Sequence, residues 1–316
     1  MPADGHVLRL SVTDRCNFRC RYCMPAGGVP LVRHADLLPL EHLAELVRWL
    51  DAELGVGRVK LTGGEPLARR GLANLVRDLR AVPGVREISM TSNGSLLAAH
   101  AEELRAAGLA RVNVSLDTLD RDRFSRLTRG GRLDDAIAGI NAALAAGLVP
   151  LKLNAVLLAS SWREDVPALL DFAASRGVEV RFIELMRTGT EAEWAEAELV
   201  PAAAVQTWLE EVTPVEAVPG PPSAPARRTR LRWRGKSLTV GWITPQSHPF
   251  CSSCNRLRLD ARGRLRRCLM DPLPLELARG LEESEAAARI RLRAYLAGKQ
   301  PPAGMNTHLP MVAVGG

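Results

Sequence analysis

Six short strand-like segments alternate with amphipathic helical segments over residues 7–184. The predicted strands are Val7–Ser11, Arg58–Leu61, Glu87–Thr91, Arg111–Ser115, Leu151–Leu157 and Glu179–Glu184. The predicted helices are Leu40–Leu54, Leu72–Ala81, Ala98–Ala107, Leu133–Ala146 and Asp165–Arg176, and several of them stop at a glycine. Because right-handed crossovers join consecutive parallel strands, this alternation predicts an α/β fold with a parallel sheet or barrel whose strands all end on one side.

The pattern changes after residue 189. An acidic segment, Glu191–Glu198, precedes a predicted helix at Ala202–Glu211 and a proline-rich loop at Pro214–Pro225. Thr229–Trp233 and Ser237–Ile243 then predict a β-hairpin, and we expect two short helices after Cys268. The predicted domains are therefore residues 1–190 and residues 191–316.

The six cysteines form two separate triplets. Cys16, Cys20 and Cys23 have the spacing C-x3-C-x2-C, and Cys251, Cys254 and Cys268 have the spacing C-x2-C-x13-C. A structural zinc site closes with four ligands, so each triplet falls one ligand short. An iron–sulfur cubane held by three thiolates keeps one iron open to a small molecule. The two triplets thus predict two metal clusters that take part in chemistry.

Polar or unusual residues follow nearly every predicted strand. The first cysteine triplet follows strand one, Thr62–Pro66 follows strand two, and Thr91–Gly94 covers the end of strand three and the turn after it. Ser115–Asp117 and Glu184–Met186 occupy the ends of strands four and six, and Lys152 and Asn154 lie in strand five. Catalytic residues of barrel enzymes come from these strand ends. Ser115 and Asp117 also suit helix caps, which leaves two roles open for them.

The segment from Cys16 to Cys23, together with Gly63-Gly64-Glu65-Pro66, resembles the radical S-adenosylmethionine superfamily. That resemblance implies a partial (βα)6 TIM-type barrel and a 4Fe–4S cluster on the first triplet, whose open iron binds S-adenosylmethionine. One electron then releases a 5′-deoxyadenosyl radical. In this context we expect the missing side chains of Gly63 and Gly64 to let the backbone approach the methionine moiety, and Glu65 to pair with a cation.

The second triplet narrows the resemblance. Phe250–Arg258 and Cys268, with Leu8–Cys16, Arg181–Met186 and the terminal glycine pair, resemble the GTP 3′,8-cyclase family of molybdenum cofactor biosynthesis. The resemblance implies abstraction of the ribose 3′ hydrogen of GTP and attack of the carbon radical on C8 of guanine. It also implies a second 4Fe–4S cluster, on a C-terminal α+β extension, that binds the base.

The resemblance further implies roles for particular residues. S-adenosylmethionine contacts are Tyr22, Gly64, Ser115 and Met186, and GTP contacts are Arg9, Lys60, Thr91, Lys152, Arg256, Leu257 and Arg258. The tail residues Gly315 and Gly316 reach the active site and assist cyclisation. Lys60 departs from the arginine common in the family and loses its bidentate geometry. The implied partners are a flavodoxin- or ferredoxin-type reductant and a downstream pyranopterin-forming enzyme, and a homodimer is left open.

Composition leaves two alternatives. Arginines are dense around the second triplet and contribute to a net charge of +7. This cluster of arginines suits a polyphosphate ligand. It also suits a zinc-bound nucleic-acid-binding protein, which is the first alternative. Aromatic residues make up 4% of the chain, which weakens a stacking platform, so no nucleic acid is expected. A two-cluster radical enzyme that matures a peptide is the second alternative.

Residues 1–6 lack a signal-peptide pattern and no apolar run reaches membrane length, so we expect a cytoplasmic protein without a membrane partner.

Overall fold

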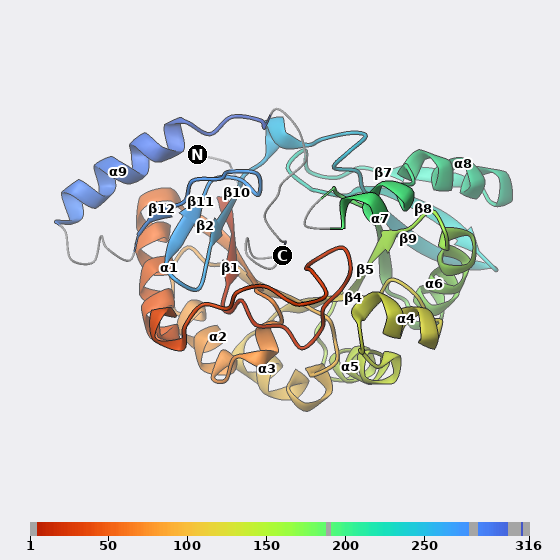
Figure 1. The fold of residues 1–316 in the computed structure, drawn as a ribbon, viewed down its shortest axis with the longest axis horizontal. Coiled ribbons are helices and arrows are strands. Elements are labelled where there is room, and N and C mark those ends of the chain that lie inside the picture. The colour runs from red at the N-terminus through yellow and green to blue at the C-terminus, as the bar shows by residue number, and fades with distance from the viewer. Residues whose placement is uncertain (1–4, 188–190, 278–283, 303–310, 312–316) are drawn as a thin grey trace.

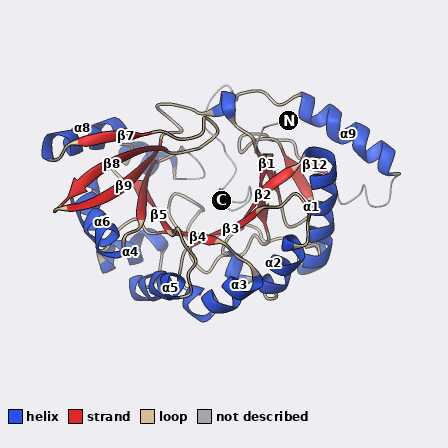
Figure 2. Ribbon diagram, turned by 180° about the vertical axis from the view of Figure 1, so that it is seen from behind, coloured by secondary structure: helices blue, strands red, loops and turns tan. Residues whose placement is uncertain are grey.

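The computed structural model describes residues 5–187, 191–277, 284–302 and 311. Its strands form one curved sheet in the order β12-β11-β10-β1-β2-β3-β4-β5-β6-β9-β8-β7. Figure 1 shows the sheet as an open wall with helices on its outer side, and Figure 2 shows the same arrangement from behind. This is the partial barrel that the sequence predicts.

The barrel strands are β1 (His6–Ser11), β2 (Val56–Thr62), β3 (Glu87–Ser92), β4 (Arg111–Ser115), β5 (Lys152–Leu157) and β6 (Glu179–Glu184), all parallel to their neighbours. The helices between them are α1 (Leu40–Leu54), α2 (Leu72–Arg80), α3 (Ala101–Ala107), α4 (Arg121–Thr128), α5 (Leu133–Ala145) and α6 (Trp162–Arg176). These elements confirm the six predicted strands and five predicted helices to within a few residues.

Helix α4 was not predicted, because only Phe124, Leu127 and Thr128 of its eight residues are buried. Its first turn is fixed locally: the carboxylate of Asp120 accepts a hydrogen bond from the backbone N–H of Arg123 at 2.7 Å. Asp120, and not Asp117, is therefore the cap of the helix that follows β4. The end of this short helix contacts the first cysteine loop.

The C-terminal segment adds strands to both edges of the barrel. Its elements are α7 (Ala192–Ala197), α8 (Ala202–Val212), β7 (Val215–Val218), β8 (Arg227–Trp233), β9 (Lys236–Ile243), β10 (Arg256–Leu259), β11 (Arg264–Arg266), β12 (Leu275–Glu276) and α9 (Glu285–Ala297). Strand β9 runs parallel to β6, and β10 runs parallel to β1. In Figure 2 helices α8 and α9 lie at opposite ends of the wall. The domain boundary at residue 190 stays a prediction, since the sheet continues across it.

One expectation for this segment is wrong. The proline-rich stretch contains β7, which pairs with β8 because the prolines flank residues 215–218 and do not interrupt them. After Cys268 the described residues hold the short strand β12 and the helix α9. The expectation of two short helices there also covers residues outside the described ranges and stays a prediction. Strands this short are defined by their partners, so their own sequence gives little signal.

Alternation along each barrel strand separates two faces. Leu8 and Leu10 of β1 are fully buried and belong to the hydrophobic core between sheet and helices, whereas Arg9 between them faces the barrel interior. The same period of two places Lys60 between the buried Val59 and Leu61 of β2. The core therefore lies outside the sheet, and the interior is left to polar side chains.

Candidate active site

The loop after β1 carries the first cysteine triplet. Its three thiols are free and partly buried. The carbonyl of Cys20 accepts hydrogen bonds from the N–H groups of Cys23 at 2.9 Å and Met24 at 3.1 Å, which turns the chain tightly. Burial, and then the neighbouring Cys23 sulfur, raises the pKa of the Cys20 thiol well above its usual range. Burial likewise raises the pKa of Cys16, and thiols that resist ionisation on their own suit a cationic metal centre.

Gly63 and Gly64 lie against the backbone of this cysteine loop. A Cβ atom on Gly64 would come within 2.2 Å of the Arg15 carbonyl oxygen and 2.9 Å of the Cys16 nitrogen. A Cβ atom on Gly63 would lie 2.6 Å from the Thr13 carbonyl oxygen. The N–H of Gly64 donates to that same oxygen at 2.8 Å. The glycine pair is thus required by the cysteine loop itself, and a contact between Gly64 and S-adenosylmethionine stays a prediction.

Glu65 joins the ends of two strands. Its carboxylate accepts hydrogen bonds from Ser92 Oγ at 2.8 Å, the N–H of Asn93 at 2.7 Å and the N–H of Leu67 at 3.2 Å. Burial raises the pKa of Glu65 to about 7. These donors are neutral, and the pairing of Glu65 with a cation stays a prediction. Asn93 in turn directs Nδ2 toward Cys16 Sγ at 4.0 Å, which ties the end of β3 to the first triplet.

Asp117 connects the cysteine loop to β5. The hydroxyl of Tyr22 donates to Asp117 Oδ2 at 2.7 Å, and the N–H of Val156 donates to Oδ1 at 2.8 Å. Burial raises the pKa of Asp117 to about 6 and raises that of Tyr22 well above its usual range. Asp117 therefore holds the tyrosine between the second and third cysteines in place.

The other predicted S-adenosylmethionine contacts lie at the carboxyl ends of strands. Ser115 is the last residue of β4, and Met186 lies two residues beyond β6. Both are partly exposed. Together with Tyr22 and Gly64 they occupy the same rim of the barrel as the first cysteine triplet, as the parallel topology requires.

The barrel interior is strongly cationic. Burial lowers the pKa of Lys60 well below its usual range, and Arg9, Arg111, Arg181 and Lys152 lower it further. These four residues lie on β1, β4, β6 and β5, so five basic side chains from five strands meet inside the barrel. Arg258 on β10 joins them, because it stands opposite Arg9 in the strand register.

Two carboxylates partly offset this charge. Glu179 accepts a hydrogen bond from Lys152 Nζ at 3.0 Å and also forms an ion pair with Arg181. Glu87 forms an ion pair with Arg111 at 2.7 Å. Six basic groups against two acidic ones leave an excess of positive charge in a space of low dielectric. A triphosphate is the kind of ligand that would balance it.

Unpaired polar atoms also line the interior. Among the described residues, Thr91 Oγ1 and Asn154 Oδ1 are buried without a hydrogen-bond partner. In the sheet register Thr91 stands next to Asn113, and Asn154 stands next to Ser115 and Arg181. Buried hydroxyl and amide groups normally find partners, so these atoms are suited to a bound polar ligand.

The second triplet gathers beside β10. Cys251 and Cys254 are linked through one turn, with the N–H of Cys254 donating to the Cys251 carbonyl at 3.2 Å. Burial, and then the neighbouring Cys268 and Cys254 sulfurs, raises the pKa of Cys251. Lys299 Nζ donates to the Cys254 carbonyl at 3.0 Å, and the N–H of Met270 points at Cys268 Sγ at 3.4 Å. The three thiols thus form a second group with cationic and N–H donors around it.

The segment Arg256–Arg258 links this second group to the barrel interior. Arg256 contacts Cys254 Sγ at 3.5 Å and stacks over Phe250 at 4.9 Å from its centroid. Burial lowers the pKa of Arg258 well below its usual range, with Arg9 contributing. Leu257 points the other way, since it is fully buried in the hydrophobic core. Its predicted contact with GTP is therefore restricted to backbone atoms.

Each triplet offers three free thiols, one fewer than the four ligands that close a structural zinc site. Within the described ranges, no group of three or more His, Cys, Asp and Glu side chains lies close enough to hold one metal ion. Three thiols suit an iron–sulfur cubane with one open iron, and a cluster on the second triplet stays a prediction.

The chain's C-terminal segment reaches the first triplet. The N–H of Met311 donates to the Cys23 carbonyl at 3.1 Å. The predicted tail residues Gly315 and Gly316 follow Met311 by four and five positions and lie outside the described residues.

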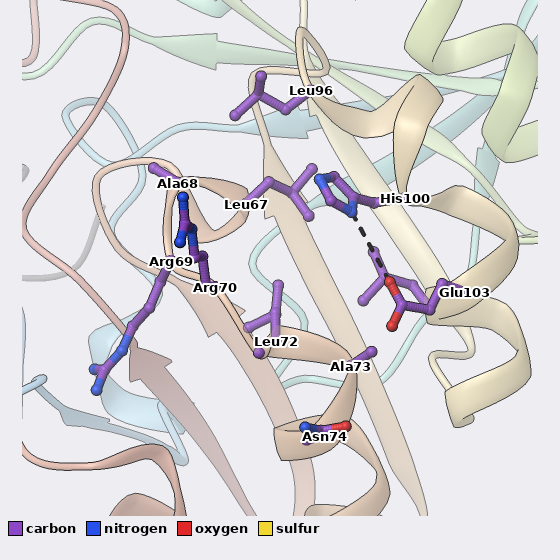
Figure 3. Close-up of a pocket in the computed structure, with 12 residues that line it drawn as sticks. Leu67, Ala68, Arg69, Arg70, Leu72, Ala73, Asn74, Leu96, His100 and Glu103 are labelled. Atoms are coloured by element: carbon purple, nitrogen blue, oxygen red, sulfur yellow. Dashed lines mark ion pairs between the residues drawn. The ribbon is translucent and has the colours of Figure 1, made fainter.

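A separate cavity of about 480 Å³ lies on the outer flank of the barrel, between α2 and α3 (Figure 3). Its lining includes Leu72 and Asn74 from α2, Glu103 from α3, and His100, whose Nδ1 lies 4.0 Å from Glu103 Oε2. None of the predicted site residues is among its lining residues. The chemistry is therefore concentrated in the barrel interior and at its rim.

Comparison with known proteins decides the family. A family model described as the radical SAM superfamily matches residues 10–173, and one described as Molybdenum Cofactor Synthesis C matches residues 178–304. A GTP 3′,8-cyclase from Moorella thermoacetica is 47% identical over 288 residues, which cover 90% of this chain and 88% of the relative. The chain belongs to the GTP 3′,8-cyclase family. Membership in the radical SAM superfamily carries with it S-adenosylmethionine and an iron–sulfur cluster as cofactors.

Other comparisons agree. GTP 3′,8-cyclase 1 of Pseudomonas aeruginosa is 44% identical over 270 residues, covering 85% of this chain and 81% of the relative. The crystal structure of Streptococcus suis SuiB bound to S-adenosylmethionine matches with a TM-score of 0.60 at 15% identity, covering 98% of this chain and 69% of that one. At that identity SuiB confirms the fold alone. None of the helices in the described part of the chain combines the length and apolar character that a membrane span requires.

The sequence patterns did not identify several residues of the site. Arg111, Arg181 and Glu179 were not predicted as part of the interior, and Asn154 was noted without a role. A signal was present: each alternates with buried apolar residues in its strand, as Arg9 does in β1. Polar residues at the inward positions of a buried parallel strand are unusual and indicate a ligand site. The partnership between Tyr22 and Asp117 left no such signal, since it depends on tertiary contact.

Proposed function

We propose that this protein converts GTP to (8S)-3′,8-cyclo-7,8-dihydroguanosine 5′-triphosphate, the first step of molybdenum cofactor biosynthesis. Membership in the GTP 3′,8-cyclase family supports this assignment. The observation that carries it is the cationic barrel interior, which extends from β10 beside the second triplet across β1 and β2 to β6. A triphosphate fits the charge of this interior, and a peptide substrate has no comparable group.

In this proposal Cys16, Cys20 and Cys23 hold one 4Fe–4S cluster, and Cys251, Cys254 and Cys268 hold a second. When bound, the first cluster and S-adenosylmethionine supply a 5′-deoxyadenosyl radical. The protein's part is to hold the adenosyl group at the rim, through Tyr22, Gly64, Ser115 and Met186, and to exclude water from it.

The nucleotide lies between the two triplets in this arrangement. Arg9, Lys60, Lys152 and Arg258 bind the triphosphate from inside the barrel, where low dielectric strengthens each contact. Arg256, which already contacts Cys254 Sγ, orients the nucleoside end beside the second triplet. Thr91 supplies a hydroxyl that has no hydrogen-bond partner among the residues that the structure describes.

Further partners belong to the same proposal. A flavodoxin- or ferredoxin-type reductant supplies the electron, and a downstream pyranopterin-forming enzyme takes the product. The tail residues Gly315 and Gly316 assist cyclisation in this proposal. We also place the protein in the cytoplasm, where free thiols persist, and a homodimer is compatible with this scheme.

The test is the release of 5′-deoxyadenosine from anaerobically reconstituted, dithionite-reduced protein given S-adenosylmethionine and GTP, ATP or no nucleotide. Mass spectrometry of the same samples detects a cyclised nucleotide. We expect both products with GTP. Release that does not depend on GTP would keep the radical chemistry and overturn the substrate.

The second cluster has its own test. Replacing Cys251, Cys254 and Cys268 together with alanine is expected to lower the iron content by about half and to abolish cyclisation. Ser252→Ala is the matched control, because Ser252 lies between two of these cysteines and is exposed. A triple variant that keeps full activity and full iron content would rule out a second cluster.

A further inference from the structure

The end of helix α4 supports the first cysteine loop. The last carbonyl groups of a helix have no partner within it. Here the carbonyl of Thr128 accepts the N–H of Arg19 at 3.0 Å, and the carbonyl of Leu127 accepts the N–H of Arg21 at 3.0 Å. The backbone on either side of Cys20 is thus bonded to the end of α4.

The side chain of Arg129 completes this support. Its Nη1 donates to the carbonyl of Arg19 and to the carbonyl of Met24, both at 3.0 Å. Arg19 precedes Cys20 and Met24 follows Cys23, so one guanidinium group spans two of the three cysteines. About a fifth of the side chain (21%) is exposed, which leaves these hydrogen bonds largely shielded from water.

The same guanidinium group reaches the start of the C-terminal segment. Its Nη2 pairs with Glu191 Oε1, and Glu191 Oε2 accepts Arg21 Nε at 3.0 Å. Arg21 also stacks over Trp194 of α7, at 4.5 Å from the ring centroid. Glu191 thereby joins the cysteine loop, the end of α4 and helix α7.

The backbone of Arg129 is unfavourable for an arginine. Its φ of 54° and ψ of 57° lie in the left-handed region, which glycine adopts with ease and L side chains rarely do. Residues 130 and 131 are glycines, so flexible residues adjoin the position. A strained arginine at a helix end whose side chain makes three contacts points to a role for that side chain.

We propose that Arg129 is a positioning residue for the first iron–sulfur cluster: it fixes the spacing of Cys20 and Cys23 and couples the loop, through Glu191, to α7. This inference rests on the proposed cluster at the first triplet. Groups that orient metal ligands from outside the coordination sphere strongly affect metal retention.

Arg129→Gly separates this role from simple helix capping, because glycine suits the backbone and lacks the guanidinium group. We measure urea unfolding of the iron-free protein and, anaerobically, the rate of iron release from reconstituted protein to a chelator, with and without S-adenosylmethionine. Iron that S-adenosylmethionine protects belongs to the cluster that binds it. We expect unchanged or higher stability, but release of the protected iron about 10-fold faster.

Three further variants sharpen the result. Arg129→Lys keeps a cation and is expected to fall between wild type and glycine, while Glu191→Gln is expected to speed release less than Arg129→Gly, since the carbonyl contacts remain. Arg126→Ala is the control, because Arg126 is exposed on the same helix. Wild-type iron release by Arg129→Gly overturns this inference alone. A wild-type protein that binds no protected iron overturns the proposed function as well.

Discussion

Replacing Gly64 with alanine places a methyl group inside the backbone of the first cysteine loop. The new Cβ atom would lie 2.2 Å from the Arg15 carbonyl oxygen, 2.5 Å from the Arg15 carbonyl carbon and 2.9 Å from the Cys16 nitrogen. All three neighbours are main-chain atoms, so no side chain can rotate away. The loop has to move by about an ångström to restore ordinary contact.

The size of the effect follows from these contacts. Overpacking a buried site costs about 1–3 kcal/mol. Displacing the loop also weakens two hydrogen bonds, Gly64 N–H to the Thr13 carbonyl and Glu65 N–H to the Arg15 carbonyl, both 2.8 Å long, at about 1 kcal/mol each. Alanine restricts the unfolded chain and returns about 0.5–1 kcal/mol. The expected loss in free energy of unfolding is about 2–4 kcal/mol.

Equilibrium urea unfolding of the iron-free protein measures this loss, and iron content after anaerobic reconstitution reports on the cysteine loop. Gly27→Ala is the matched control, since Gly27 follows the first triplet closely and its added Cβ would meet nothing within 4 Å. We expect the control to match wild type in both measurements. A Gly64→Ala protein within about 0.5 kcal/mol of wild type and with full iron content would refute the packing argument.

Three other outcomes are expected. Burial raises the pKa of Glu65 from 4.5 to about 7. The contribution of Glu65 to the free energy of unfolding of the iron-free protein is therefore fully present below pH 4.5. It falls by about 3 kcal/mol as the pH rises through 7. Urea unfolding at several pH values should show a flatter profile for Glu65→Gln, and an unchanged profile would contradict the burial of this carboxyl. Glu179→Gln leaves Lys152 and Arg181 without their shared carboxylate, and thermal unfolding should show a loss of about 3 kcal/mol in the free energy of unfolding. GTP should then raise the melting temperature of this variant more than that of wild type. An equal rise would argue against a triphosphate at these cations. Deleting the last two residues should stop cyclisation while release of 5′-deoxyadenosine continues, and cyclised product at the normal rate would show that the tail has no catalytic part.

Local sequence patterns determined most of the barrel. The six strands and five of the six helices between them lie within a few residues of their predicted positions, because hydrophobic periodicity and glycine stops act over short distances. The cysteine spacings and the Gly63-Gly64 pair could also be recognised in the sequence. A loop that is to hold a metal cluster through three cysteines needs a fixed number of residues between one cysteine and the next. Family comparison then confirmed the radical S-adenosylmethionine fold that these motifs resemble.

Tertiary structure decided how these parts are joined. Strand β10 pairs with β1 across roughly 250 positions of sequence, with Val7 opposite Arg256, and this pairing carries the second triplet to the barrel. The partners of Glu65, Asp117 and Arg129 come from elements that no local pattern relates to them. The sequence by itself thus determined the strands, the two cysteine triplets and the class of chemistry. Which cations meet in the interior, and which groups hold the cysteine loops, depended on contacts between distant residues, because hydrogen bonds and burial are properties of the folded chain.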